Sequence, residues 1–89
     1  MSGDYRISVL GAAAKYLERC DAPTRDRLKQ KFERLKADPF DVQNSKPLKG
    51  RKEQRSARVG DLRILFRVDG LEIIVAAIGP RGEIYKHGS

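Results

Sequence analysis

Hydrophobic positions follow two periods along this chain. In the first half apolar residues recur with helical spacing, and in the second half they alternate with polar residues, as they do in strands. The pattern predicts a strand over 5–10, helices over 12–20 and 23–37, an irregular loop over 40–50, and strands over 54–59, 62–68 and 71–79. Because helices and strands come in separate runs, we expect an α+β fold: an N-terminal strand, an α-helical hairpin, then an antiparallel β-meander packed on the helices.

Turn and cap residues set the boundaries of these elements. Asp21 or Thr24 can cap the second helix, and Pro23 suits its first turn. The pairs at 60–61 and 69–70 combine glycine with aspartate between alternating strands, so each predicts a two-residue hairpin turn.

Counting outward from these two turns predicts the register of the meander and its two faces. The count pairs Val59 with Leu62, Arg58 with Arg63, Ala57 with Ile64, Arg55 with Phe66, Val68 with Leu71, Arg67 with Glu72 and Arg63 with Ala76. The face against the helices should carry Val59, Leu62, Ile64, Phe66, Val68, Leu71, Ile73, Val75 and Ala77. The opposite, open face should carry Ser56, Arg58, Arg63, Leu65, Arg67, Glu72, Ile74 and Ala76.

Two arginines on the open face lack a predicted partner. Arg67 would face Glu72, but Arg58 would face Arg63, and like charges opposite each other destabilise a sheet. Such a pair is a candidate anion site, since guanidinium groups match phosphate geometry. The last strand ends beside the 60–61 turn, which would bring Arg81 and Tyr85 to the same end of the sheet. The alternative is a set of solvated arginines and a packed tyrosine.

Composition agrees with a small basic domain spanning 1–89. Net charge is +7 over 89 residues, and the segment 46–67 alone holds eight basic and two acidic residues. A polyanionic partner is therefore expected. Cys20, the one cysteine, reads either as a reactive thiol or as a small buried residue, and the second reading is favoured. We expect no metal, no membrane segment and a cytoplasmic location.

Four segments resemble the RelE/ParE toxin superfamily: 46–50 (KPLKG), 58–66 (RVGDLRILF), 77–81 (AIGPR) and 83–85 (EIY). The resemblance extends over about 5–86 and implies a toxin of a type II toxin–antitoxin system. RelE-type members are endoribonucleases that cut messenger RNA in the ribosomal A site. The resemblance implies that Arg63 contacts the scissile phosphate and that Arg81 lies near the leaving group. It also implies that Tyr85 stacks on the RNA and that Arg58 is a basic or structural residue on the preceding strand.

The sequence departs from this pattern where RelE-type enzymes place basic strand residues that assist proton transfer. Those positions fall on Gln54 and Ser56, which leaves the general base open, and His87 is a candidate acid or base. Pro80 stands where a histidine is common and Leu62 where a tyrosine is usual. Further RNA-binding residues are expected among the basic side chains before and on the first meander strand: Lys46, Lys49, Arg51, Lys52 and Arg55.

Three functions therefore stay open. The first is a metal-independent endoribonuclease that uses the RNA 2′-hydroxyl as nucleophile and acts on mRNA, with the ribosome as a possible partner. The second is a ParE-like inhibitor of DNA gyrase that acts by binding alone. The third is an inactive relative that binds only an antitoxin. A cognate antitoxin is implied by the resemblance, and no cofactor is expected.

Overall fold

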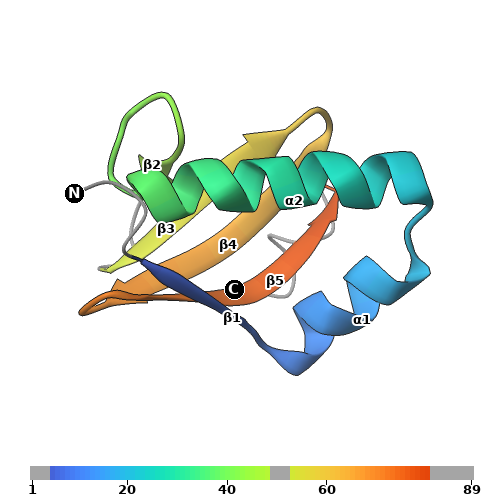
Figure 1. The fold of residues 1–89 in the computed structure, drawn as a ribbon, viewed down its shortest axis with the longest axis horizontal. Helices are drawn as coiled ribbons and strands as arrows, with labels where there is room; N and C mark the ends of the chain where they lie inside the picture. Colours follow the sequence, from blue (N-terminus) through green and yellow to red (C-terminus); the bar gives the residue numbers. More distant parts are fainter. Residues whose placement is uncertain (1–4, 49–52, 81–89) are drawn as a thin grey trace.

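The computed structural model describes residues 5–48 and 53–80. It has an α+β fold in which two helices lie on one side of a five-stranded sheet of order β1-β5-β4-β3-β2 (Figure 1). The elements are β1 Arg6–Val9, α1 Gly11–Arg19, α2 Ala22–Ala37, β2 Lys46–Pro47, β3 Gln54–Val59, β4 Leu62–Asp69 and β5 Glu72–Pro80. The predicted fold class is confirmed, and no helix among the described residues is long and apolar enough to cross a membrane.

The junction between the two helices is fixed by polar side chains. Asp21 is the N-cap of α2, and its carboxylate accepts a hydrogen bond from the Thr24 backbone N–H at 3.2 Å. Hydrogen bonding by the Thr24 side chain, and then by its backbone N–H, lowers the pKa of Asp21. Arg25, one turn into α2, reaches back to the last carbonyls of α1 and donates to Leu17 at 2.9 Å and to Cys20 at 3.0 Å. These carbonyls have no partner within α1, so Arg25 stabilises the end of that helix.

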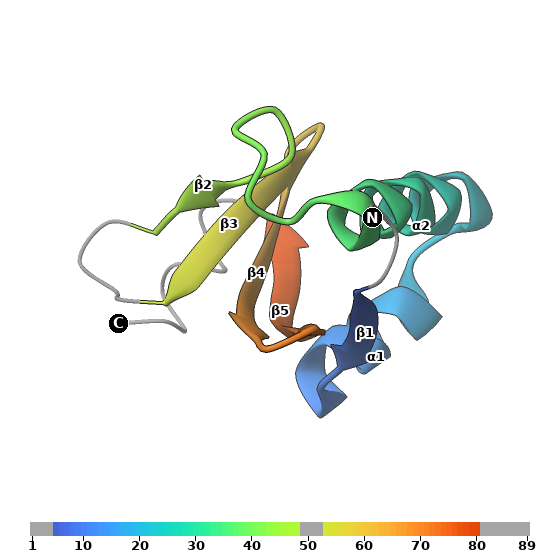
Figure 2. The same cartoon turned by 60° about the vertical axis from the view of Figure 1, so that its left-hand side comes forward.

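α2 covers one face of the sheet, which we call the front face, and α1 lies beside β5 (Figures 1 and 2). The core lies between α2, α1 and the front face. Its buried members are Ala13, Leu28, Phe32, Leu35, Ala57, Ile64, Phe66, Ile73, Val75 and Ile78. The opposite side of the sheet is the back face.

The register of the first hairpin is confirmed, and that of the second is wrong. Val59 pairs with Leu62 and Arg58 with Arg63, as counted. On the second hairpin Asp69 pairs with Glu72, so the turn consists of Gly70 and Leu71. Gly60 and Gly70 each take the first turn position, with φ of +58° and +61°. A type II′ turn needs glycine there, whereas the predicted turn would have placed Gly70 second.

The shifted turn leaves Ile73 and Val75 on the predicted face, but a bulge in β5 exchanges the faces for the residues after it. Leu65 pairs with Ala77 and Phe66 with Val75, so Ala76 is the extra residue. After it Ile78, not Ala77, enters the core. Leu71, expected in the core, lies in the turn and is 56% exposed.

Two further pairings were not anticipated. The N-terminal strand β1 pairs in parallel with β5, through Arg6 opposite Glu72 and Val9 opposite Val75, so the sheet is mixed. The predicted irregular loop contains the short strand β2, which pairs with β3. The N-terminal strand was predicted but its partner was not, because pairing is decided by residues far away in sequence. A two-residue strand that contains a proline gives little periodic signal.

Candidate nucleic-acid interface

The back face places polar and basic side chains in rows that run across the strands. Nearest the β3–β4 turn, Arg58, Arg63 and Gly79 are neighbours on β3, β4 and β5. The next row holds Lys46, Ser56, Leu65 and Ala77, and the row beyond holds Gln54, Arg67, Ile74 and Ser8. Adjacent strands are separated by about 4.8 Å, so each row brings groups from distant segments together.

Arg58 and Arg63 form the predicted like-charge pair. The Nε of Arg58 donates to the carbonyl oxygen of Gly60 at 3.1 Å, which holds the guanidinium beside the turn. Among the described residues, neither arginine has an ion pair. Arg63 faces Gly79 on its other side instead of the predicted Ala76, and Gly79 is itself buried. Two uncompensated guanidinium groups beside a glycine can bind an anion.

The predicted partnership of Arg67 and Glu72 is wrong, because the second hairpin is shifted. Arg67 pairs with Ile74 and is exposed, without an ion pair to any described residue. Glu72 instead accepts a hydrogen bond from the Ser8 hydroxyl on β1. Arg67 therefore adds a third positive charge to the back face, further from the turn.

Lys46 and Arg55 were both predicted to bind RNA, and the structure places them on different sides of the sheet. Lys46 lies on the back face opposite Ser56. Arg55 points to the front side, where its Nε donates to the Ser45 hydroxyl at 2.7 Å and its guanidinium lies 5.2 Å from the Phe40 ring centroid. These contacts attach the segment after α2 to β3, which gives Arg55 a structural role.

The two positions that carry basic residues in RelE-type enzymes are also on the back face. Gln54 faces Arg67, and Ser56 faces Leu65. An amide and a hydroxyl offer hydrogen bonds here, but neither carries a positive charge. The interface therefore supplies arginines for charge stabilisation and, among the described residues of these rows, no amine close to Arg63.

The remaining predicted site residues lie outside the described residues. These are Lys49, Arg51 and Lys52 before β3, and Arg81, Tyr85 and His87 after β5. The register does fix where the chain leaves the sheet: Pro80 pairs with Leu62, one residue from Arg63. The segment that carries Arg81 thus starts at the end of the sheet where Arg58 and Arg63 lie.

One basic residue near this end was missed in the sequence. Arg27 of α2 approaches the β3–β4 turn, and its Nη1 lies 3.9 Å from where a Cβ on Gly60 would stand. No site residue was predicted on this helix. The missed signal is the spacing of Arg27, Lys31 and Arg34, which puts three cations on one flank of α2.

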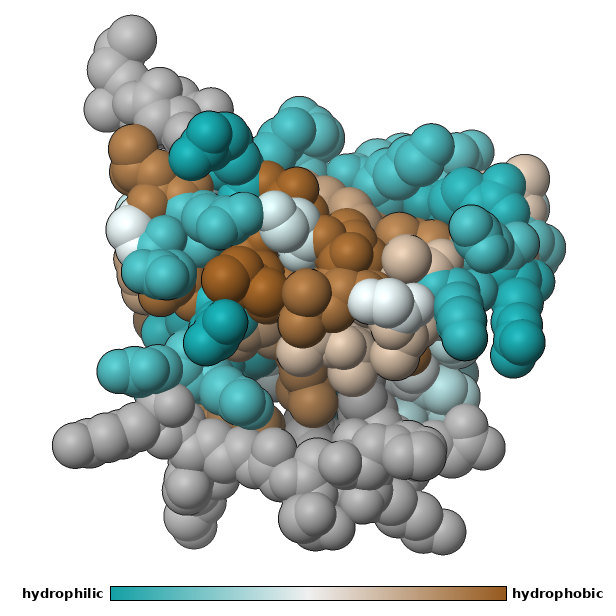
Figure 3. Space-filling view, turned by 90° about the horizontal axis from the view of Figure 1, so that it is seen from below, coloured by the Kyte–Doolittle hydropathy of each residue, from teal (hydrophilic) through white to brown (hydrophobic). Residues whose placement is uncertain are grey.

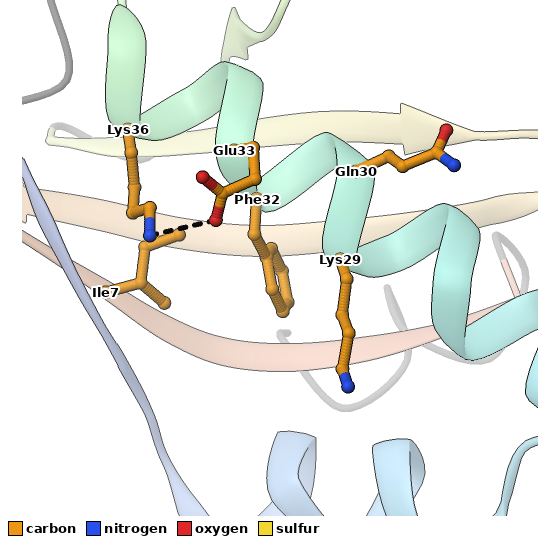
Figure 4. A pocket seen from close by; sticks show the side chains of 6 residues that line it. All are labelled: Ile7, Lys29, Gln30, Phe32, Glu33 and Lys36. Carbon is orange, nitrogen blue, oxygen red and sulfur yellow. Dashed lines mark ion pairs between the residues drawn. The ribbon is translucent and has the colours of Figure 1, made fainter.

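The other flank of α2 has a different character. Ile7 of β1 and Phe32 of α2 line an open hollow of about 300 Å³, with charged residues at its rim, including the pair Lys36–Glu33 at 2.8 Å (Figure 4). Seen from below Figure 1, apolar side chains form a band through the middle of the molecule (Figure 3). An apolar hollow with neutralised charges does not suit a phosphate backbone, so the back face is the better nucleic-acid site.

Cysteine and metal chemistry have little support within the part of the chain that the structure describes. Cys20 is half-buried against the core, and its thiol donates to the Leu17 carbonyl at 3.3 Å, which agrees with the favoured packing role. No group of three or more His, Cys, Asp or Glu side chains in 5–48 and 53–80 could hold a metal ion.

The fold is that of the RelE/ParE superfamily of small toxins. The family model described as "ParE toxin of type II toxin-antitoxin system, parDE" matches residues 7–85, so the chain belongs to this family. No curated protein sequence matches the chain.

Solved structures show the same fold at low sequence identity. The RelBE2 toxin–antitoxin complex of Mycobacterium tuberculosis matches with a TM-score of 0.74 and 24% identity, over 88% of this chain and 99% of that one. A mutant of the E. coli toxin RelE in the free state matches with a TM-score of 0.77 and 18% identity, over 97% of this chain and 93% of that one. YafQ of E. coli matches with a TM-score of 0.69 and 18% identity, over 91% of this chain and 98% of that one.

Proposed function

We propose that this toxin binds RNA on the back face of its sheet and cleaves it with the RNA's own 2′-hydroxyl as nucleophile. The observation that carries the proposal is the pair Arg58–Arg63: two guanidinium groups face each other on neighbouring strands, with no carboxylate bonded to either among the described residues. A phosphodiester between them would relieve their repulsion and accept hydrogen bonds from both.

The proposed reaction needs positioning and charge stabilisation more than a protein nucleophile. The 2′-oxygen attacks the adjacent phosphorus while its proton passes to a base, and the bond from phosphorus to the 5′-oxygen breaks as that oxygen takes a proton. The products are a 2′,3′-cyclic phosphate and a 5′-hydroxyl end. Arginines that donate to the non-bridging oxygens stabilise the extra negative charge of the transition state, an effect worth about 10²–10³ in rate per donor.

The proposed roles of the individual residues follow from the resemblance to RelE-type enzymes. They also follow from the position of the arginine pair at the end of the sheet where the chain leaves β5. Arg63 would hold the scissile phosphate, with Arg58 next to it. Arg81 would act at the leaving group, Tyr85 would stack on a base, and His87 would act as acid or base. Because Gln54 and Ser56 supply no amine, proton transfer in this proposal depends on the residues after β5.

The proposed substrate is messenger RNA, engaged at the ribosome. A cognate antitoxin is part of the proposal, because the matching structures include RelE–RelB complexes from Pyrococcus horikoshii and Methanococcus jannaschii. The back face and the helical hairpin are the two surfaces that an antitoxin could cover.

A second candidate is inhibition of DNA gyrase by binding alone. The match to the ParE family model supports it, and so do Gln54 and Ser56 at positions where RNA-cleaving relatives have basic residues.

The test adds purified protein to a translation extract that contains end-labelled message. We expect cleavage within codons, reduced at least about 100-fold by Arg63→Ala and by Arg81→Ala. Lys15→Ala is the matched control: Lys15 is exposed on α1, outside the sheet, and the variant should cleave like the wild type. Intact message together with inhibited supercoiling by purified gyrase would refute the nuclease and support the second candidate.

A further inference from the structure

Three basic residues of α2 form a stripe on the flank of the helix that faces β3. Arg27, Lys31 and Arg34 follow the i, i+4, i+7 spacing that places side chains on one side of a helix. Lys29 and Lys36 point to the opposite flank, toward β1 (Figure 4). We call the first three residues the helix stripe.

The helix stripe begins at the turn that carries the arginine pair. The Nη1 of Arg27 lies 3.9 Å from the position of a Cβ on Gly60, and the Nε of Arg58 donates to the carbonyl of that same Gly60. Guanidinium groups from α2 and from β3 therefore flank one glycine. Since Arg63 pairs with Arg58, positive charge continues from the back face, around the β3–β4 turn, onto the helix.

Within the part of the chain that the structure describes, the side chains of the helix stripe form no ion pair, although the charge of Arg27 reaches Asp21 at the start of α2 and helps to lower the pKa of that carboxyl. The ion pair on α2 is Lys36–Glu33, on the other flank, and no side chain of the stripe has a hydrogen bond or ion pair with a described residue. The pKa of Lys31 is lowered, first by partial burial and then by the charge of Arg34. Like charges held together without a carboxylate are the same arrangement as on the back face.

We propose that the helix stripe binds backbone phosphates of the single-stranded RNA next to the cleavage point, so that the RNA runs from the back face around the β3–β4 turn and along α2. This rests on the proposed function. Stripe residues rise about 6 Å and about 4.5 Å along the helix axis between successive members, a step that suits consecutive phosphates of an extended strand. An acidic protein segment is the less favoured occupant, because the stripe is continuous with the arginine pair rather than with the apolar hollow.

The test measures binding of a short, uncleavable 2′-O-methyl RNA by fluorescence anisotropy across salt concentrations. The variant carries Arg27→Gln, Lys31→Gln and Arg34→Gln together. The matched control carries Lys15→Gln, Arg19→Gln and Lys29→Gln, which remove the same charge from exposed positions on α1 and on the other flank of α2. For single-stranded nucleic acid, each phosphate contact adds about 0.7 to the steepness of the plot of log affinity against log salt concentration, so removing one contact reduces the slope by that amount. The stripe variant should therefore lose about 2 in slope, and the control well under 1.

Each outcome bears on the stripe separately from cleavage. Equal slopes for the stripe variant and the control would overturn the inference, even if Arg63→Ala abolishes cleavage. A slope loss in the stripe variant supports it, even if the wild type leaves message intact and the proposed nuclease fails. If the stripe variant loses binding to poly-glutamate but not to RNA, the stripe belongs to an acidic protein partner and the inference is wrong. A further variant, Arg27→Lys, keeps the charge and should bind RNA close to the wild type.

Discussion

The like-charge pair Arg58–Arg63 makes a prediction about stability that needs no knowledge of the target. Two unit charges about 8 Å apart in water repel by about 0.5 kcal/mol. Arg58→Glu turns this repulsion into attraction of similar size, so the change is about 1 kcal/mol at most. The lost hydrogen bond from Arg58 to the Gly60 carbonyl, which is exposed, offsets part of it. We expect a net gain of about 0.5 kcal/mol, or roughly 2–4 °C in Tm for a domain of this size.

A double-mutant cycle isolates the pair from the general effect of lowering net charge. It compares the wild type, Arg58→Glu, Arg63→Glu and the double variant by urea unfolding at low salt. Both single variants have opposite charges, and the wild type and the double variant have like charges. The four Coulomb terms add up to a coupling energy of at most about 2 kcal/mol.

Salt supplies the control for the cycle. At 1 M salt the Debye length is about 3 Å, so the coupling energy should fall close to zero. A coupling energy near zero at low salt, or one that salt does not change, would refute the reasoning that the two guanidinium groups repel each other. It would also remove the physical argument that this pair is kept for an anionic ligand.

Three further predictions concern the contacts that hold the scaffold. Arg25→Ala should lower the free energy of unfolding by about 1–3 kcal/mol, because carbonyls at the end of α1 lose a charged donor; urea unfolding measures it, and a change below 0.5 kcal/mol would contradict the capping role. Asp21→Asn keeps an N-cap oxygen but cannot titrate. Because the Thr24 bonds lower the pKa of Asp21, the wild type should lose stability as pH falls through 3.8 and below. The variant should lose less stability over the same range, which a measurement of Tm against pH would show. Arg55→Lys keeps the charge but loses the bond to Ser45 and the contact with the Phe40 ring. The free energy of unfolding should drop by about 1–2 kcal/mol while RNA affinity stays within twofold. Unchanged stability together with a larger loss of RNA affinity would make Arg55 an RNA ligand.

Local patterns were enough to predict most of the elements. The stripe of Leu28, Phe32 and Leu35 predicted α2, and the Gly-Asp turn at 60–61 gave the register that puts Arg58 opposite Arg63. Both signals act over a few residues. They describe what the chain prefers before distant partners contribute.

The second hairpin could not be counted correctly from the sequence. An Asp-Gly pair fits two turn types, and the choice of type II′ moved Gly70 to the first turn position. The bulge at Ala76 depends on how β5 packs against β4 and the helices, which leaves no local signature. As a result Arg67 pairs with Ile74 instead of the predicted Glu72, and Arg63 pairs with Gly79 instead of the predicted Ala76.

The part played by α2 was also beyond sequence reasoning. A helix with many lysines and arginines predicts a solvated face. The approach of Arg27 to the turn, with its Nη1 3.9 Å from where a Cβ on Gly60 would stand, shows which flank lies near the end of the sheet. For Arg55 the sequence did carry the signal: its predicted pairing with Phe66, a core residue, put it on the front side, and the structure confirms that pairing. The RNA-binding role was predicted instead from its place in a basic run.

The central claim is that Arg58 and Arg63 bind a phosphodiester of single-stranded RNA. The most direct measurement is an NMR titration of the arginine Nε–H resonances with a short 2′-O-methyl RNA. We predict that the signals of Arg58 and Arg63 shift together and saturate at one Kd, while the signal of Arg25, which bonds the end of α1, stays in place. Unmoved Arg58 and Arg63 signals at RNA concentrations that saturate the protein would contradict the account.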